Sequence, residues 1–243
     1  MTVADWGLLM AAATAAGWVD AVVGGGGLIL LPAILLVAPQ LTQQAALATN
    51  KATAVFGTVA AVVTFARKVS LDWKVLVPAG AIAATTSAAG AAAVSLIDRD
   101  LFVPIIMVVL VGVAVLVTCR PTIGRTAAPS PPTHRKVLIV IGLAAAGIGF
   151  YDGILGPGTG TFLIIVFATM LGTEFVRSAA MAKVINVGSN VGALTYFAFT
   201  GSVYWQLGAA MAACNVVGAV LGSRTAVARG AGFVRIVLLV IVI

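Results

Sequence analysis

Two polar elements recur in this otherwise apolar sequence, and each combines a carboxylate with a run of helix-breaking residues. Asp20 is followed by four consecutive glycines at 24–27, and Asp152 is followed by "GPGTGT" at 156–161. Gly and Pro end helices, and a helix that begins after such a break presents unpaired N–H groups and the positive end of its dipole. Two facing helix N-termini of this kind would hold an anion without a charged side chain. The alternative is close packing of helices through small residues.

A lysine lies inside one apolar segment of each half of the chain. Lys51 and Lys183 lie about a third of the way along segments 43–66 and 175–199. Ionisable groups at such depth are expensive to insert and mark a substrate pathway or an ion pair. We therefore predict that both lysines take part in binding or conducting the substrate. The alternative is that each lysine extends its ammonium group to the membrane interface.

Amide and hydroxyl side chains accompany both lysines. Thr49 and Asn50 directly precede the first lysine in "LATNKAT". Asn186 and Asn190 share a helix face with the second lysine, because they follow it by three and seven residues. These four side chains are therefore candidates for hydrogen bonds to a bound anion.

The two carboxylates, Asp20 and Asp152, have two interpretations that the sequence leaves open. Each could neutralise the lysine of its own half, or one of them could carry a proton during transport. Two aspartates and two lysines sum to zero charge, so the positive field available to an anion would come from the helix N-termini.

Composition indicates whether these residues lie in a soluble protein or in a membrane protein. The chain has 243 residues, of which 61% are hydrophobic and 9% are charged. Soluble domains carry about 25% charged residues, so we expect an integral membrane protein. The apolar stretches lack the alternation of a β-barrel, which indicates an all-α polytopic fold. They cover 4–22, 28–38, 43–66, 75–96, 101–119, 137–155, 161–171, 175–199, 205–227 and 233–243.

The chain contains an internal repeat. A shift of 132 residues places "GWVDAVVGGGG" from Gly17 over "GFYDGILGPGT" from Gly149, and it superposes Lys51 on Lys183 and Trp73 on Trp205. Coincident Asp, Lys and Trp residues are rare in such a composition. We therefore predict two homologous transmembrane repeats, 1–119 and 137–243, joined by a polar linker at 120–136.

The loop charges predict that the two repeats have opposite orientations. Loop 67–74 is basic, whereas its equivalent at 200–205 has no basic residue, and the acidic loop 96–100 corresponds to a loop with three arginines near 224–235. Under the positive-inside rule, 67–74, 120–136 and 224–235 are cytoplasmic, and 96–100 and 200–204 are external. Inverted repeats with broken helices are typical of secondary transporters, whose sites lie near the membrane midplane.

Two stretches, 28–38 and 161–171, are only about half a bilayer long and directly follow the glycine clusters. An inverted repeat needs an odd number of crossings in each half. These stretches therefore either span the membrane or form re-entrant pairs with their neighbours, and a single broken helix over 4–38 is disfavoured.

Several other interpretations are weaker. A nucleotide-binding loop lacks the required Gly-Lys-Thr/Ser, and the basic residues that give the net charge of +7 lie at segment ends, which points to topology rather than nucleic acid. His134 is expected in a solvated loop, and Cys119 and Cys214 are expected to be ordinary buried thiols. The first segment lacks a basic start and is expected to be a retained helix. We expect no metal and no cofactor, with membrane lipid around the protein and a homo-oligomer as a possibility.

At these motifs the chain resembles the TauE/SafE sulfite exporter family, from Gly17 onward. The resemblance implies a bacterial inner-membrane transporter for sulfite, sulfonates or other small sulfur-containing anions. One departure is that Ala182 stands where the first repeat has Asn50. The resemblance and the motifs together give Asp20 and Asp152 as ion-pair or proton-coupling residues, and as candidate substrate-binding residues Gly24, Gly25, Gly26, Gly27, Thr49, Asn50, Lys51, Gly156, Pro157, Gly158, Thr159, Gly160, Lys183, Asn186 and Asn190.

Three functions remain in view. The first is a secondary carrier that exports a small oxyanion or sulfonate, and the second is an anion channel with the same architecture. The third, a membrane enzyme or assembly factor that uses the buried aspartates, is disfavoured because no His, reactive Cys or Ser–Lys dyad lies at catalytic spacing beside them.

Overall fold

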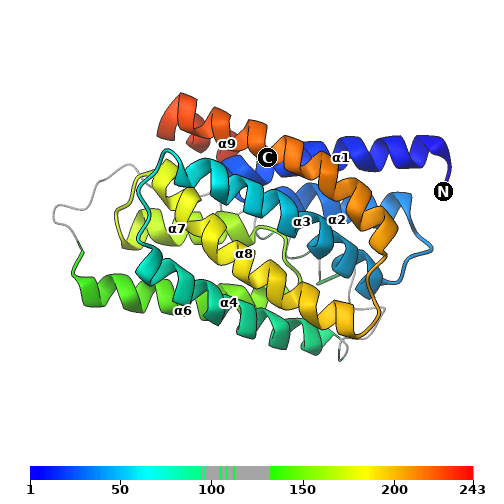
Figure 1. The fold of residues 1–243 in the computed structure, drawn as a ribbon, viewed down its shortest axis with the longest axis horizontal. Helices are drawn as coiled ribbons and strands as arrows, with labels where there is room; N and C mark the ends of the chain where they lie inside the picture. The colour runs from blue at the N-terminus through cyan, green and yellow to red at the C-terminus, as the bar shows by residue number, and fades with distance from the viewer. Residues whose placement is uncertain (95, 97–103, 106–107, 109–111, 113–131, 243) are drawn as a thin grey trace.

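The computed structural model describes residues 1–94, 96, 104–105, 108, 112 and 132–242, and the regular structure in these residues is helical (Figure 1). Expected segments 43–66 and 175–199 are confirmed to the residue as helices. The helices are α1 (Val3–Val23), α2 (Gly26–Val37), α3 (Gln43–Ala66), α4 (Trp73–Val94), α6 (His134–Ile154), α7 (Thr159–Met170), α8 (Phe175–Phe199) and α9 (Trp205–Val242).

The helix starts repeat along the chain with the offset found in the sequence. Adding 132 to the first residues of α1, α2, α3 and α4 gives the first residues of α6, α7, α8 and α9 to within one position. Equivalent helices run in opposite directions: α1 starts at the labelled N-terminus on the right of Figure 1, and α6 starts at the left end. The same holds for α3 and α8.

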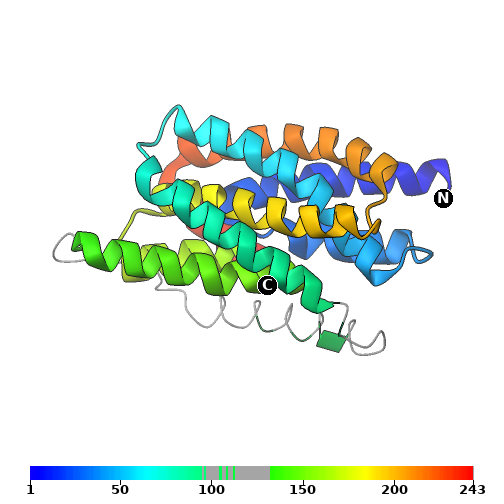
Figure 2. The ribbon, with the colours of Figure 1, turned by 60° about the horizontal axis from the view of Figure 1, so that its bottom comes forward.

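The two sets of helices interlock. Helix α1 packs along α9, and its equivalent α6 packs along α4, as Figure 2 shows on one face of the bundle. Helix α3 packs on α9, α8 packs on α4, and α3 and α8 contact each other at the centre. Exchanging the two halves therefore turns each of these main contacts into another one, which is the pattern of a pseudo-twofold axis.

The short helices α2 and α7 start at the glycine clusters, as expected. Gly24 ends α1 with φ of 79°, and Gly158 precedes α7 with φ of 82°, backbone conformations that favour glycine. The two breaks touch: a Cβ added to Gly24 would lie 2.2 Å from the carbonyl carbon of Gly160, and the Thr161 hydroxyl donates to the Val23 carbonyl at 2.8 Å. The N-termini of α2 and α7 therefore meet inside the bundle.

Five helices among the described residues are long and apolar enough to cross a membrane: Val3–Val23, Gln43–Ala66, Trp73–Val94, His134–Ile154 and the Trp205–Val234 part of α9. Helix α8 has 25 residues, but it carries Lys183, Asn186 and Asn190. These polar side chains are buried inside the bundle. The chain is therefore a multi-pass membrane protein whose most polar helix is central.

The structure refines two of the expected loops. Most of the region 224–235 is helical, but the helix is interrupted within it at Gly230, whose φ of 72° and ψ of −171° are not helical and which separates the helix that starts at Trp205 from a second helix that follows. Glycine adopts this backbone conformation more readily than other residues, so the chain changes direction there. His134 is not in a loop; it is exposed, but it is the first residue of α6, which the Thr133 hydroxyl caps.

The other loops follow the expectation where they can be seen. Helices α3 and α4 are joined by 67–72, and α8 and α9 by 200–204. The expected loop residues 97–100, most of segment 101–119 with Cys119, and linker residues 120–131 lie outside the described residues. Cys214 is a free, partly buried thiol.

The close backbone contacts between helices give the first testable expectation. A Cβ added to Gly188 on α8 would lie 2.1 Å from the Gly80 carbonyl oxygen on α4. A Cβ added to Gly147 on α6 would have no neighbouring atom within 4 Å. We expect Gly188→Val to destabilise the protein by about 1–3 kcal/mol or more, and Gly147→Val to have a much smaller effect. Thermal unfolding of the two variants in detergent, monitored by size-exclusion chromatography, makes the comparison; equal stabilities would contradict this packing.

Candidate substrate site

A buried cavity lies where the two helix breaks meet. Its volume is about 30 Å³, which is room for roughly two water molecules. Both halves of the chain contribute to its wall, through the α1–α2 and α6–α7 breaks and through α3, α8 and α9. The lining residues are Ala16, Asp20, Gly24, Gly26, Gly27, Leu30, Asn50, Lys51, Ala54, Asp152, Gly156, Thr159, Gly160, Asn186, Asn190 and Asn215.

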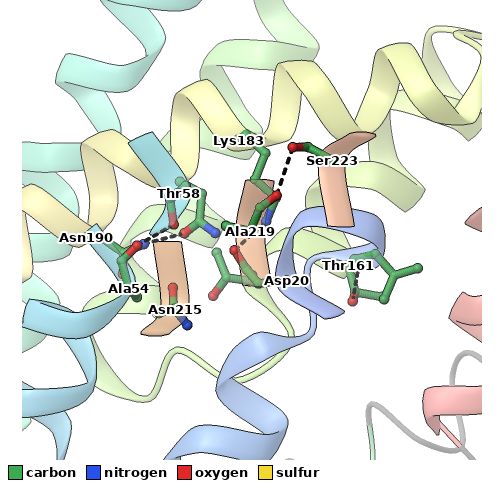
Figure 3. Close-up of polar contacts among 12 residues, drawn as sticks. Asp20, Ala54, Thr58, Thr161, Lys183, Asn190, Asn215, Ala219 and Ser223 are labelled. Carbon is green, nitrogen blue, oxygen red and sulfur yellow. Dashed lines mark hydrogen bonds and ion pairs between the residues drawn. The ribbon is translucent and has the colours of Figure 1, made fainter. Parts of the chain in front are cut away.

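Two ion pairs cross between the halves. Lys51 Nζ lies 2.7 Å from Asp152 Oδ2. Lys183 Nζ lies 2.7 Å from Asp20 Oδ2 (Figure 3). The expectation that each aspartate neutralises the lysine of its own half is therefore wrong. The reason is the interlocking of the halves, which brings each lysine to the helix break of the other half. A Cβ added to Gly156 in the α6–α7 break, for example, would lie 2.9 Å from Lys51 Nζ.

The two ion pairs have different surroundings. The Thr159 hydroxyl lies 2.7 Å from Asp152 Oδ1 and 2.8 Å from the Gly156 carbonyl oxygen, so it bridges the carboxylate to the α6–α7 break. The hydrogen bond of Asp20 is the one from Lys183. The exposed fraction of the side chain is 3% for Asp152 and 18% for Asp20. Both carboxylates line the cavity, and Asp20 is the more exposed of the two.

Carboxamides complete the polar wall. On α8, Asn190 Nδ2 donates to Asn186 Oδ1 at 3.1 Å, and Ser189 Oγ lies 3.3 Å from the same oxygen. Asn215 Nδ2 on α9 donates to the Ala13 carbonyl at 2.9 Å. Figure 3 draws Asn190 and Asn215 with the Asp20–Lys183 pair. These bonds fix the amide orientations around the cavity.

Most of the residues singled out in the sequence come together here. Asp20, Gly24, Gly26, Gly27, Asn50, Lys51, Asp152, Gly156, Thr159, Gly160, Asn186 and Asn190 line the cavity. Five residues do not line it. Lys183 is fully buried and forms an ion pair with Asp20. Gly25 precedes the first turn of α2, and Gly158 precedes the first turn of α7. The Pro157 carbonyl accepts a hydrogen bond from the Tyr151 hydroxyl. The Thr49 hydroxyl donates to the Ala45 carbonyl and accepts from the backbone N–H of Tyr204.

Asn215 is a site residue that sequence reasoning missed. The repeat could not point to it, because its equivalent in the first half is Ala83. The available signal was an amide in the middle of the apolar segment 205–227. Its side chain packs against Gly57, where an added Cβ would meet Asn215 Oδ1, so a small residue on α3 makes room for it.

Charged and polar groups buried between the breaks of interlocked apolar helices are typical of membrane transporters. The chain belongs to the TauE/SafE family: the family model "Sulfite exporter TauE/SafE" matches residues 9–243. It is 34% identical to a probable membrane transporter protein of a Sinorhizobium species, over 96% of this chain and 87% of that one. It is 32% identical to the probable membrane transporter protein YfcA of Escherichia coli K12, over 97% and 86%. No solved structure matches the chain.

The cross-half pairing makes a sharp prediction for double variants. Lys51→Ala leaves the buried Asp152 carboxylate without its cation, and breaking such a pair costs about 3–5 kcal/mol. Removing both partners, in Lys51→Ala with Asp152→Ala, should recover much of this loss. The matched control is Lys51→Ala with Asp20→Ala, which breaks both ion pairs and should be less stable than either single variant. The unfolding temperatures of the single variants Lys51→Ala and Asp20→Ala and of the two double variants are measured on the purified proteins in detergent. Recovery of stability by adding Asp20→Ala, instead of Asp152→Ala, to Lys51→Ala would contradict the assignment of the ion pairs.

Proposed function

We propose that this protein is a secondary carrier that exports sulfite or a related small sulfur-containing anion across the bacterial inner membrane. One observation carries the proposal: the first turns of α2 and α7, from opposite halves, border the same cavity as Lys51 and four asparagines. Helix N-termini, an ammonium group and amide N–H groups are the donors that an oxyanion needs.

The cavity suits a small anion better than a cation. Its carboxylates are each engaged by a lysine, so their charge is already compensated. The unpaired N–H groups at the starts of α2 and α7 add positive potential. Sulfite has four heavy atoms and needs more room than two water molecules, so binding requires the two halves to move slightly apart around the site.

We propose that the two halves lie in the membrane as inverted repeats, in which α1–α2 and α6–α7 form re-entrant pairs. The opposite directions of equivalent helices support the inversion, and the basic residues near 67–74 support a cytoplasmic location for that end. The lengths of α2 and α7, 12 residues each, correspond to about 18 Å of helix. This is shorter than a bilayer core of about 30 Å.

A second cavity, of about 600 Å³, lies at the end of the bundle with loop 67–72, between α4, α6 and α8, and its wall includes Asp72, His134, Glu174 and Arg177. We propose that the larger cavity is the cytoplasmic vestibule.

Labelling from the two sides of the membrane tests the topology. Ser70 and Ser202 lie in the loops at opposite ends of the bundle. Single cysteines at these positions, in a background that lacks Cys119 and Cys214, should react with an impermeant thiol reagent from opposite sides, Ser70→Cys from the cytoplasm. Labelling of both from one side would contradict the inverted repeat.

Binding and counterflow test the substrate. We expect sulfite, in a thermal-shift screen with sulfate, thiosulfate, taurine and sulfoacetate, to stabilise the wild type. Proteoliposomes should accumulate labelled sulfite against an unlabelled gradient, as only a carrier does. Asn190→Ala removes a donor to a charged ligand and should weaken binding about tenfold or more. The matched control is Thr195→Ala on the exposed face of α8. Equal affinities of these two variants would remove Asn190 from the site, and absence of sulfite counterflow would contradict the proposed substrate.

A further inference from the structure

The two ion pairs are related by the repeat, but they are not equivalent. Lys51 and Asp152 have exposed side-chain fractions of 2% and 3%, and the Thr159 hydroxyl also reaches the carboxylate. Lys183 is fully buried, but Asp20 is 18% exposed, toward the cavity. Both carboxylates line the cavity and each accepts one hydrogen bond, but Asp20 is the more exposed of the two.

The two helix breaks also differ in sequence. Residue 159 in the second half corresponds to residue 27 in the first, where the sequence has glycine instead of threonine. The first half thus lacks the hydroxyl that, in the second half, lies 2.7 Å from Asp152 Oδ1.

A bound anion upsets the charge balance of this site. The two lysines and two aspartates sum to zero, so an anion leaves one uncompensated negative charge in a region of low dielectric. A proton on Asp20 would cancel that charge.

We propose that Asp20 is the proton-coupling residue: it takes up a proton when the anion binds and releases it on the other side of the membrane with the anion. The inference rests on the proposed function of the same cavity. The proton adds to a carboxylate oxygen of Asp20 from the solution on one side and leaves to the solution on the other, and no other bond forms or breaks. Anion and proton therefore move in the same direction, which their combined gradients set.

The other charged residues near Asp20 are engaged in ion pairs, which leaves Asp20 as the residue for proton coupling. Among the described residues that line the cavity, the charged ones besides Asp20 are Lys51 on α3 and Asp152 on α6, which are paired with each other. From α8, Lys183 faces Asp20 directly. The lining residues from α2, α7 and α9 are Gly26, Gly27, Leu30, Thr159, Gly160 and Asn215, none of which carries a charge.

Proton and anion fluxes measured together test the proposal. Proteoliposomes of the full chain, loaded with a pH-sensitive dye, receive a gradient of sulfite or of methanesulfonate, which carries no proton of its own. We expect wild-type protein to move protons with the anion. Asp20→Asn imitates the protonated carboxyl, so the number of protons moved per anion should fall at least tenfold in the anion flux that this variant retains. Asp152→Asn, the matched control, removes the other carboxylate of the cavity and should leave the number of protons moved per anion unchanged.

The outcomes separate the two levels of the proposal. If the wild type transports neither sulfite nor methanesulfonate, the proposed function fails, and this inference fails with it. If it transports an anion without protons, or if Asp20→Asn still moves protons with the anion, only the role of Asp20 is overturned.

Discussion

The structure depends on one constraint: a charge inside a membrane protein must have a partner, because an isolated ion in a low-dielectric interior is too costly. Here each lysine finds its partner in the other half of the chain. The ion pairs therefore make the two halves interdependent, and they place all four charges at the interface between the halves.

Glycines at the helix contacts allow the two halves to pack closely enough for these ion pairs to form. The backbones at Gly24 and Gly160 touch, as do those at Gly80 and Gly188, so the helices approach closely enough for the lysine stems to cross the interface. Since apolar surface gives no driving force between helices in lipid, this close packing and the buried polar contacts hold the bundle together. The glycines thus have both roles considered from the sequence, packing at some positions and a helix break at others.

The sequence predicted the long central helices and the two short ones, because length, apolar content and helix breakers are local properties. It also predicted most of the cavity wall, because the repeat singled out the Asp, Lys and glycine positions. It did not predict the ion-pair partners, since pairing is decided by how α3 and α8 meet the opposite half. Nor did it predict Asn215, whose repeat equivalent is an alanine.

The most direct test of the account is a crystal structure of the protein with selenite, a close analogue of sulfite whose selenium can be located by anomalous scattering. The account predicts a selenium peak in the cavity between the first turns of α2 and α7, within reach of Lys51, Asn190 and Asn215, with Lys51 still beside Asp152. A peak outside this cavity, or Lys51 paired with Asp20, would contradict it.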